Sequence, residues 1–225
     1  MLPRVLEPEA MDTPEEAAEY DAMDHGAVNA RFVADFLDAH GPCRGGTILD
    51  VGTGTARIPI ALCRVDQGAI VLAVDLSQPM LNRAFTNVTE AGLSDRITLE
   101  SVDAKGFPYP SGRFEGVVSN TIVHHIPNPT PAIVEMARVV APGGTMMVRD
   151  LCRPDSLDDV ACLVATSAGG ESASARALFE ASLHAALTLD EIRGIIKELG
   201  LSEASLTMTS NRHWTFIWRR PRDDR

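Results

Sequence analysis

The sequence predicts an α/β fold with a doubly wound, mostly parallel sheet that ends in an antiparallel hairpin. Five short apolar runs alternate with amphipathic stretches of helical length, as parallel strands and their crossover helices do. These runs occupy residues 47–51, 69–74, 97–102, 114–119 and 145–150. Two further strand-like runs, 203–209 and 214–219, are joined by Ser210, Asn211 and Arg212, which is typical of a hairpin.

Length and charge restrict the class of protein. With 225 residues, 45% hydrophobic and 23% charged, the chain fits one large globular domain with a full core. The formal net charge is −11 and the pI is near 4.9. Because phosphate backbones attract positive charge, we expect no nucleic-acid partner.

The absence of long apolar segments and of paired cysteines predicts where the protein is located and whether it binds a metal ion. No apolar run is long enough to cross a bilayer, and the start has no secretory hydrophobic segment, so a cytoplasmic protein without membrane association is expected. The cysteines are scattered and form no C-x-x-C pair, which predicts neither a metal site nor a disulfide framework. They are Cys43, Cys63, Cys152 and Cys162. Monomer and homodimer both remain open.

Two helices are predicted before the first strand. Thr13, Pro14 and Glu16 combine a capping hydroxyl, a proline in the first turn and a capping-box acid, so a helix should run from there to about residue 23. A second helix at 26–39 places apolar residues along one face and ends at Gly41. Neither helix is needed to complete a sheet.

The loop after the first strand is the centre of the sequence. Asp50 ends an apolar run, and Gly52 and Gly54 lead into a helix that reaches about residue 64. Glycines accept positive φ and let a ligand approach the backbone, while the helix start offers unpaired N–H groups. A dinucleotide fold requires a third glycine where this chain has Arg57. An ordinary strand-to-helix turn is the alternative that uses no ligand.

The remaining elements follow in order. Helices are predicted after Ser77, which is a capping residue, and from Thr130 to about residue 140. Pro142, Gly143 and Gly144 should turn the chain into the fifth strand. Residues 156–187 read as helical with a break near 168–172, and Thr188 begins a capping box for a helix that ends at Gly200.

Together, these features resemble a known family. Asp50-x-Gly52-x-Gly54 resembles the first motif of class I S-adenosylmethionine-dependent methyltransferases, with Ala56 where that family often has a third glycine. The Pro-Gly-Gly turn and the terminal hairpin occur in the family's order, within about residues 45–220. The chain is similar to the methyltransferase type 11 or UbiE-like small-molecule group. The resemblance implies a seven-stranded sheet and S-adenosylmethionine as cofactor, with S-adenosylhomocysteine as product.

The resemblance also implies cofactor-binding residues. Asp50 would orient the loop and the cofactor's ammonium, and the backbone of Gly52, Thr53 and Gly54 would face its amino-acid part. An acid at the end of the second strand would accept from the ribose, and an acid at the end of the third would accept from the adenine. These positions, with their neighbours and the residue after the fourth strand, are Asp75, Leu76, Asp103, Ala104 and Asn120.

Acceptor and catalytic residues follow from the same comparison. Residues at the carboxyl end of a central strand face the ligand crevice, so His124 or His125 could serve as a general base. His25, in the N-terminal helical segment that the family places over the cofactor, is a third candidate. For adjacent histidines, we expect at most one ring to face the pocket. Acceptor-binding candidates are Tyr20, Asp24, Asn29 and Arg153, although Arg153 could instead pair with Asp150 or Asp155.

One methyltransferase domain over 1–225 is therefore predicted, with a small-molecule methyl acceptor as its partner. Its parts would be an N-terminal helical cap, a cofactor-binding core, a helical cap insertion, and a final helix with the hairpin, at 1–41, 45–152, 153–187 and 188–220. Three alternatives stay open. They are methylation of RNA, DNA or protein, an NAD(P)-dependent oxidoreductase, and a nucleotide-binding module without catalytic activity.

Overall fold

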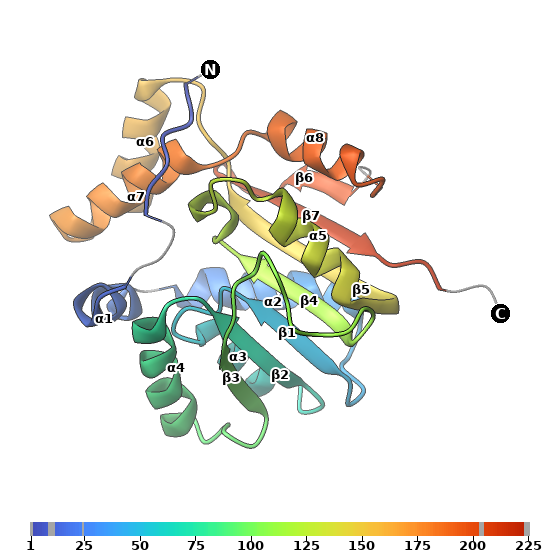
Figure 1. The fold of residues 1–225 in the computed structure, drawn as a ribbon. Helices are drawn as coiled ribbons and strands as arrows, with labels where there is room; N and C mark the ends of the chain where they lie inside the picture. The colour runs from blue at the N-terminus through green and yellow to red at the C-terminus, as the bar shows by residue number, and fades with distance from the viewer. Residues whose placement is uncertain (1, 9–11, 24, 203–204, 223–225) are drawn as a thin grey trace. The chain divides into compact units, whose positions relative to one another are not determined.

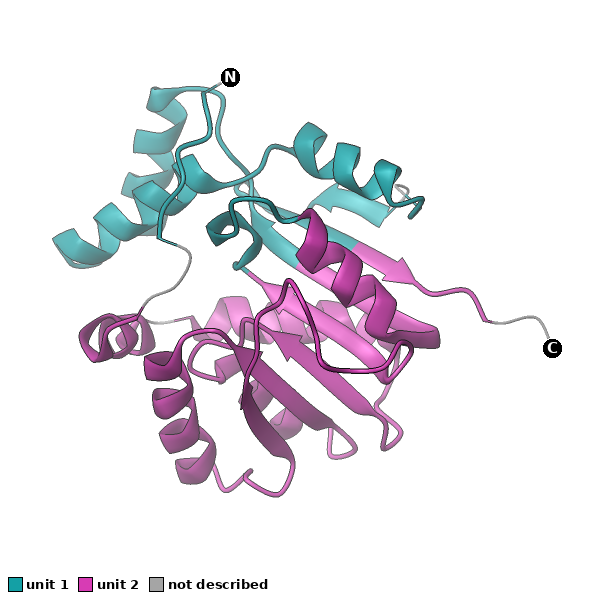
Figure 2. Ribbon diagram, in the orientation of Figure 1, with its two compact units in different colours: residues 1–10, 121–129, 149–216 teal, residues 11–120, 130–148, 217–225 magenta. Residues whose placement is uncertain are grey.

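The computed structural model describes residues 2–8, 12–23, 25–202 and 205–222. Asp24 and the expected strand residues 203–204 lie outside them. The chain divides into two compact units (Figure 2). Unit 1 comprises residues 1–10, 121–129 and 149–216, and unit 2 comprises residues 11–120, 130–148 and 217–225.

The described strands form a seven-stranded sheet in the order β3-β2-β1-β4-β5-β7-β6 (Figure 1). Strand β1 pairs in parallel with β2 and β4, β2 pairs in parallel with β3, and β6 pairs antiparallel with β7. The predicted fold class is thus confirmed. The bounds are β1 Thr47–Val51, β2 Ile70–Asp75, β3 Ile97–Ser101, β4 Phe114–Asn120, β5 Val140–Leu151, β6 Leu206–Met208 and β7 His213–Arg219.

The helices of unit 2 begin where the capping residues predicted. Thr13 and Glu16 form the capping box of α1, in which the Thr13 hydroxyl accepts from the Glu16 N–H at 3.2 Å. The Ser77 hydroxyl accepts from the Met80 N–H and starts α4. In Figure 1, α2 and α3 lie behind the parallel strands and α5 in front of them. The bounds are α1 Pro14–Ala22, α2 Gly26–His40, α3 Arg57–Val65, α4 Gln78–Glu90 and α5 Thr130–Val139.

The core of unit 2 lies where α2 and α3 cover the strands. Phe36 of α2 is 1% exposed and packs among the buried apolar side chains of β1, β2 and α3. A Cβ at Gly116 in β4 would come within 2.8 Å of the Phe36 ring and 2.9 Å of Ile48. Glycine at 116 therefore makes the room into which this phenylalanine packs.

The start of β5 differs from the sequence prediction. Pro142, Gly143 and Gly144 were expected to form a turn before residue 145, but the strand begins at Val140, directly after α5. Backbone pairing continues through the glycines, because the Gly143 N–H donates to the Arg220 carbonyl at 2.9 Å. A Cβ at Gly144 would come within 2.7 Å of the Glu115 carbonyl, so a side chain there would force the strands apart.

Unit 1 contains the predicted helical insertion and the hairpin. The insertion is broken by residues 168–172, as expected, and a small apolar cluster of Leu151, Val160, Leu183 and Ala186 lies beneath it. The Thr188–Glu191 capping box starts α8. The bounds are η1 Val123–His125, α6 Leu157–Ser167, α7 Ala173–Ala185 and α8 Leu189–Glu198. Among the described residues, no helix is both long and apolar enough to cross a bilayer.

Replacement of Phe36 by alanine tests the core of unit 2. Phe36→Ala should reduce the free energy of unfolding by about 3–5 kcal/mol, because it removes buried ring contacts and leaves a cavity. Phe85→Ala is the matched control, since this ring is 67% exposed, and its effect should stay within about 0.5 kcal/mol. Urea unfolding followed by circular dichroism measures both. Equal losses in the two variants would contradict this assignment of the core.

Candidate functional site

The glycine loop folds over the end of β2. The N–H groups of Gly52 and Thr53 both donate to the Val74 carbonyl at 2.9 Å. Gly52, Gly54 and Ala56 all have positive φ, at 71°, 54° and 62°. Ala56 thus adopts the left-handed conformation where a glycine would carry less strain, and it is buried. The loop is a strained backbone turn that two hydrogen bonds fix to the end of β2.

Asp50 is a buried carboxylate beneath this loop. Its residue is 2% exposed, and its Oδ2 atom has no hydrogen-bond partner among the described residues. Its pKa is raised to about 7, mainly by burial and also by the nearby Asp75, while the Thr53 hydroxyl opposes the shift. A cationic group that reached Oδ2 would satisfy this oxygen and favour its charged form.

Asp75, at the end of β2, holds the loop from the other side. Its Oδ2 accepts from the Gly54 N–H at 2.7 Å and its Oδ1 accepts from the Ser77 N–H at 2.9 Å. Burial raises the pKa of this carboxyl, against the opposing effect of the backbone donors. Each oxygen keeps a second lone pair for another donor. The neighbouring Leu76 is 46% exposed, so its apolar surface faces outward beside the carboxylate.

Asp103 lies in the loop after β3, and its side chain stabilises the turn of that loop. Its Oδ1 accepts from the Lys105 N–H at 2.9 Å and lies 3.1 Å from the Lys105 ammonium. The side chain is 44% exposed, so part of the carboxylate remains accessible. The residue therefore serves as a loop cap whether or not it also binds a ligand.

A small cavity brings several sequence-predicted residues of unit 2 together. It is lined at the loop by Gly52 and Thr53, at the end of β4 by Asn120, and from the N-terminal helices by Tyr20, His25 and Asn29. The Tyr20 ring lies 5.2 Å from the His25 ring, centroid to centroid. A Cβ at Gly54 would lie 3.6 Å from the Tyr20 ring. The predicted Asp24 lies outside the described residues.

A buried carboxylate fixes α1 beside the loop, and sequence reasoning missed it. Asp21 accepts from Arg57 through Nε at 2.8 Å and Nη2 at 2.9 Å, from Arg83 at 2.6 Å and from Asn87 at 2.9 Å. The Asn87 amide also donates to the Thr55 carbonyl. Burial raises the pKa of Asp21, but the two guanidinium groups outweigh it and hold the pKa at about 2. The available signal was Arg57 in the place of a third glycine.

His124 and His125 belong to unit 1, so they are described with their own neighbours. His124 Nδ1 lies 2.5 Å from Asp150 Oδ1, and its Nε2 lies 3.2 Å from Glu7 Oε1. Burial lowers the pKa of His124, but the two carboxylates raise it to about 9. Burial and the neighbouring His124 lower the pKa of His125. With both ring nitrogens directed at carboxylates, His124 is poorly placed to act as a general base.

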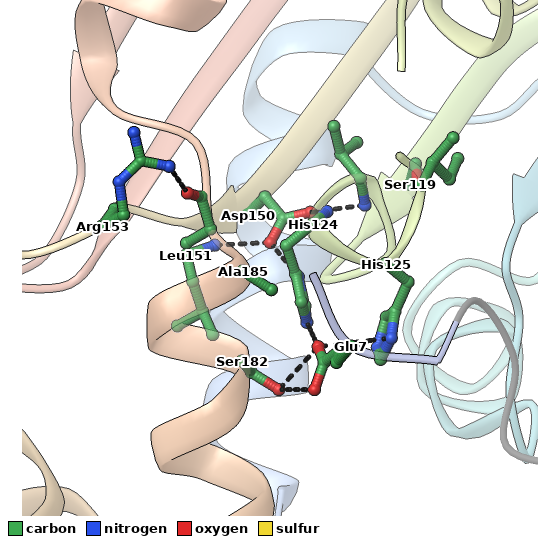
Figure 3. A network of polar contacts seen from close by, with 12 residues as sticks. Glu7, Ser119, His124, His125, Asp150, Leu151, Arg153, Ser182 and Ala185 are labelled. Atoms are coloured by element: carbon green, nitrogen blue, oxygen red, sulfur yellow. Dashed lines mark hydrogen bonds and ion pairs between the residues drawn. The ribbon is translucent and has the colours of Figure 1, made fainter. Parts of the chain in front are cut away.

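The two adjacent rings do not diverge as we expected. Their centroids lie 4.2 Å apart, and His125 Nδ1 lies 3.3 Å from the same Glu7 oxygen. One carboxylate attracts both rings, which is why they point the same way (Figure 3). Glu7 was not a candidate in the sequence, because nothing in its local pattern links it to residues 124–125.

Arg153 pairs within unit 1 rather than with either predicted aspartate. Its Nη2 lies 2.6 Å from Glu191 Oε1, and its Nη1 donates to the Ala186 carbonyl at 2.6 Å. The residue is 5% exposed. Its guanidinium thus joins α8 to the end of α7.

Known proteins share this chain's sequence and fold. Residues 49–148 match a family model described as a methyltransferase domain. The 27-O-demethylrifamycin SV methyltransferase of Amycolatopsis mediterranei is 29% identical over 167 residues, covering 73% of this chain and 57% of that protein. The ubiquinone/menaquinone biosynthesis C-methyltransferase UbiE of Vibrio parahaemolyticus is 28% identical over 143 residues, covering 61% of this chain and 55% of that protein. The chain thus spans little more than half the length of these relatives.

A solved structure extends the likeness in fold to most of the chain. The crystal structure of a SAM-dependent methyltransferase from Aquifex aeolicus superposes with a TM-score of 0.69 and covers 92% of this chain and 98% of that chain. The sequence identity is 17%, so this match concerns the fold alone.

The charge of Asp21 should make stability depend on pH. Its folded pKa of about 2 lies below the ordinary 3.8, so the ionised carboxylate stabilises the fold above pH 3.8 and this contribution is lost as the pH falls toward 2. Because Arg57 and Arg83 are 47% and 45% exposed, we discount the effect to about 1–2 kcal/mol. Urea unfolding of wild type and Asp21→Asn between pH 6 and pH 2 measures it.

The difference between wild type and Asp21→Asn should shrink by that amount over this pH range. Asp38→Asn, an exposed acid on α2, is the matched control and should differ little from wild type throughout. A difference for Asp21→Asn that is independent of pH would show that the carboxylate's charge adds no stability.

Proposed function

We propose that the chain is a class I S-adenosylmethionine-dependent methyltransferase that transfers the methyl group of S-adenosylmethionine to a small organic molecule. The observation that carries the proposal is the glycine loop of unit 2. There, a turn of positive-φ residues lies between a buried carboxylate with an unsatisfied oxygen, Asp50, and a second carboxylate, Asp75.

These residues fit the cofactor's functional groups. We assign Asp50 Oδ2 to the ammonium of the methionine part, since a buried unsatisfied oxygen calls for a cationic donor. The backbone of Gly52, Thr53 and Gly54 would lie against that part. The remaining lone pairs of Asp75 would accept from the ribose hydroxyls, and the adenine would lie near Leu76, Asp103 and Ala104. The sulfonium supplies a methyl group that is already activated for transfer.

The protein's own contribution is to align the acceptor and to exclude water. The hydrogen bonds of Asp21 hold α1 and place Tyr20 beside Gly54. We propose that Tyr20, Asn29 and Asn120 contact the acceptor or the transferred group. Among the histidines, His25 is the candidate base, because it lines the cavity at the glycine loop. It would act only where the acceptor atom must lose a proton.

A small molecule is the favoured acceptor. The relatives are named for a rifamycin and for ubiquinone and menaquinone biosynthesis, which supports a small organic compound as substrate. The net charge of −11 argues against RNA or DNA as the acceptor. An NAD(P)-dependent reaction is disfavoured because Arg57 occupies the third-glycine position and is bound by Asp21.

Calorimetry with S-adenosylmethionine and S-adenosylhomocysteine tests the cofactor. Wild type should bind both, and Asp75→Asn should bind them about 10–100-fold more weakly, because it weakens charge-assisted hydrogen bonds to the ribose. Asp95→Asn, an exposed acid, is the matched control and should bind like wild type. NAD⁺ and NADP⁺ should not raise the unfolding temperature.

The calorimetry results test cofactor binding and the ribose assignment of Asp75 separately. No binding by folded wild type would overturn the proposed function. Undiminished binding by Asp75→Asn would overturn only the ribose assignment. Stabilisation by a nicotinamide cofactor without stabilisation by S-adenosylmethionine would favour the oxidoreductase alternative.

His25→Asn tests the base through the acidity of the acceptor. S-adenosylhomocysteine formation is measured on a panel of hydroquinones, phenols and rifamycin-type macrocycles. For phenols that are protonated at the assay pH, kcat should fall by about 10²-fold. For nitrophenols that are already ionised, it should change little. His184→Asn, on α7 in unit 1, is the control. A uniform loss across the panel would contradict the role of base.

A further inference from the structure

The segment 2–8 is anchored to η1 and α7 in unit 1. The Arg4 guanidinium donates to four carbonyls, those of His124 and Ile126 at 3.0 Å, Pro127 at 3.0 Å and Ala185 at 2.7 Å. The Val5 N–H donates to the His184 carbonyl at 3.1 Å. These contacts hold the backbone of the segment and bring the Glu7 carboxylate against both rings of η1 (Figure 3).

Three donor atoms converge at this point. Glu7 Oε1 lies 3.2 Å from His124 Nε2 and 3.3 Å from His125 Nδ1, and all three atoms lie within 4.8 Å of one another. A tetrahedral ion with bonds near 2.1 Å requires donors about 3.4 Å apart. Two edges of such a site therefore already have the required length.

The surroundings orient the donors as in known metal centres. Asp150 Oδ1 lies 2.5 Å from His124 Nδ1, which orients the ring so that Nε2 is directed at Glu7. A metal ion at this point would replace the Nε2 proton, while Nδ1 kept its proton toward Asp150. Asp150 is itself fixed by the N–H groups of Val123 at 2.6 Å and Leu151 at 2.6 Å. The Ser182 hydroxyl donates to the Glu7 carboxylate at 3.1 Å. These contacts orient His124 and Glu7 from outside the site. His125 Nδ1 also lies 3.2 Å from the Pro8 carbonyl, a contact that a bound metal ion would replace.

Charge and burial also favour a cation. His124 is 3% exposed and Glu7 9% exposed, and two carboxylates flank the single imidazole of His124. The Arg4 guanidinium is directed at carbonyl oxygens rather than at either carboxylate. Glu7 and Asp150 together carry two negative charges, whereas a protonated His124 carries one positive charge. A divalent ion would neutralise the two carboxylates better than this single proton does.

We propose that Glu7, His124 and His125 bind a divalent transition metal ion such as Zn²⁺, which ties the segment 2–8 to η1. Two imidazoles and one carboxylate suit Zn²⁺, Co²⁺ or Ni²⁺ and do not suit Ca²⁺ or Mg²⁺, which prefer sites built of oxygen. Three protein ligands leave a fourth position for water or an exogenous ligand. The scattered cysteines gave no sign of this site, because none of them takes part.

Cobalt binding to untagged, chelator-treated full-length protein tests the proposal. Wild type should bind one equivalent of Co²⁺ with the visible absorption of tetrahedral coordination, and Zn²⁺ should displace it. His125→Asn and Glu7→Gln should each weaken binding at least 100-fold, and Asp150→Asn about 10–100-fold. The matched controls are His184→Asn and Glu180→Gln, which should bind like wild type.

Amide exchange supplies a second readout. Zn²⁺ should slow exchange of the Val5 N–H at least 10-fold in wild type and should leave it unchanged in His125→Asn. Thermal unfolding without metal checks that the variants fold. Absence of stoichiometric binding by wild type, or binding that His125→Asn and Glu7→Gln leave unchanged, would overturn the site. Because S-adenosylmethionine binding is measured separately, either proposal can fail without the other.

Discussion

The backbone turn between β1 and α3 is the constraint on which the rest of unit 2 depends. Gly52 and Thr53 donate to Val74, and Gly54 donates to the Asp75 carboxylate, so the end of one parallel strand shapes the loop that follows its neighbour. This works because the register places Val51 beside Val74. Beneath this turn, Asp50 is buried and its Oδ2 has no hydrogen-bond partner among the described residues.

The N-terminal helix depends on this loop through one carboxylate. Asp21 accepts from Arg57, at the start of α3, and from Arg83 and Asn87 of α4. Because α3 begins directly after the glycine loop, the position of α1 and that of the loop are linked. Tyr20 precedes Asp21 in the chain and reaches Gly54 as a consequence. A helix that the sheet does not need thereby becomes part of the candidate site.

Polar contacts around η1 organise one part of unit 1. Asp150, Glu7 and Arg4 all bind η1 through its rings or its carbonyls. Such a network is stable only if every buried member is satisfied. Arg4 donates to partly buried carbonyls and Ser182 donates to the Glu7 carboxylate, so these two side chains satisfy part of the network.

The sequence by itself determined the order of helices and strands, the fold class, the glycine loop and the acids at the strand ends. It could do so because these depend on local signals: apolar period, capping residues such as Thr13 and Ser77, and glycines that must adopt positive φ. It misjudged the start of β5, where pairing with residue 220 overrides the local turn preference of Pro142 and Gly143. Only the tertiary structure decided which side chains meet. Asp21 lies 36 residues from Arg57 in the chain, and Glu7 lies more than a hundred residues from His124, and no local pattern encodes pairs formed by packing at such separations.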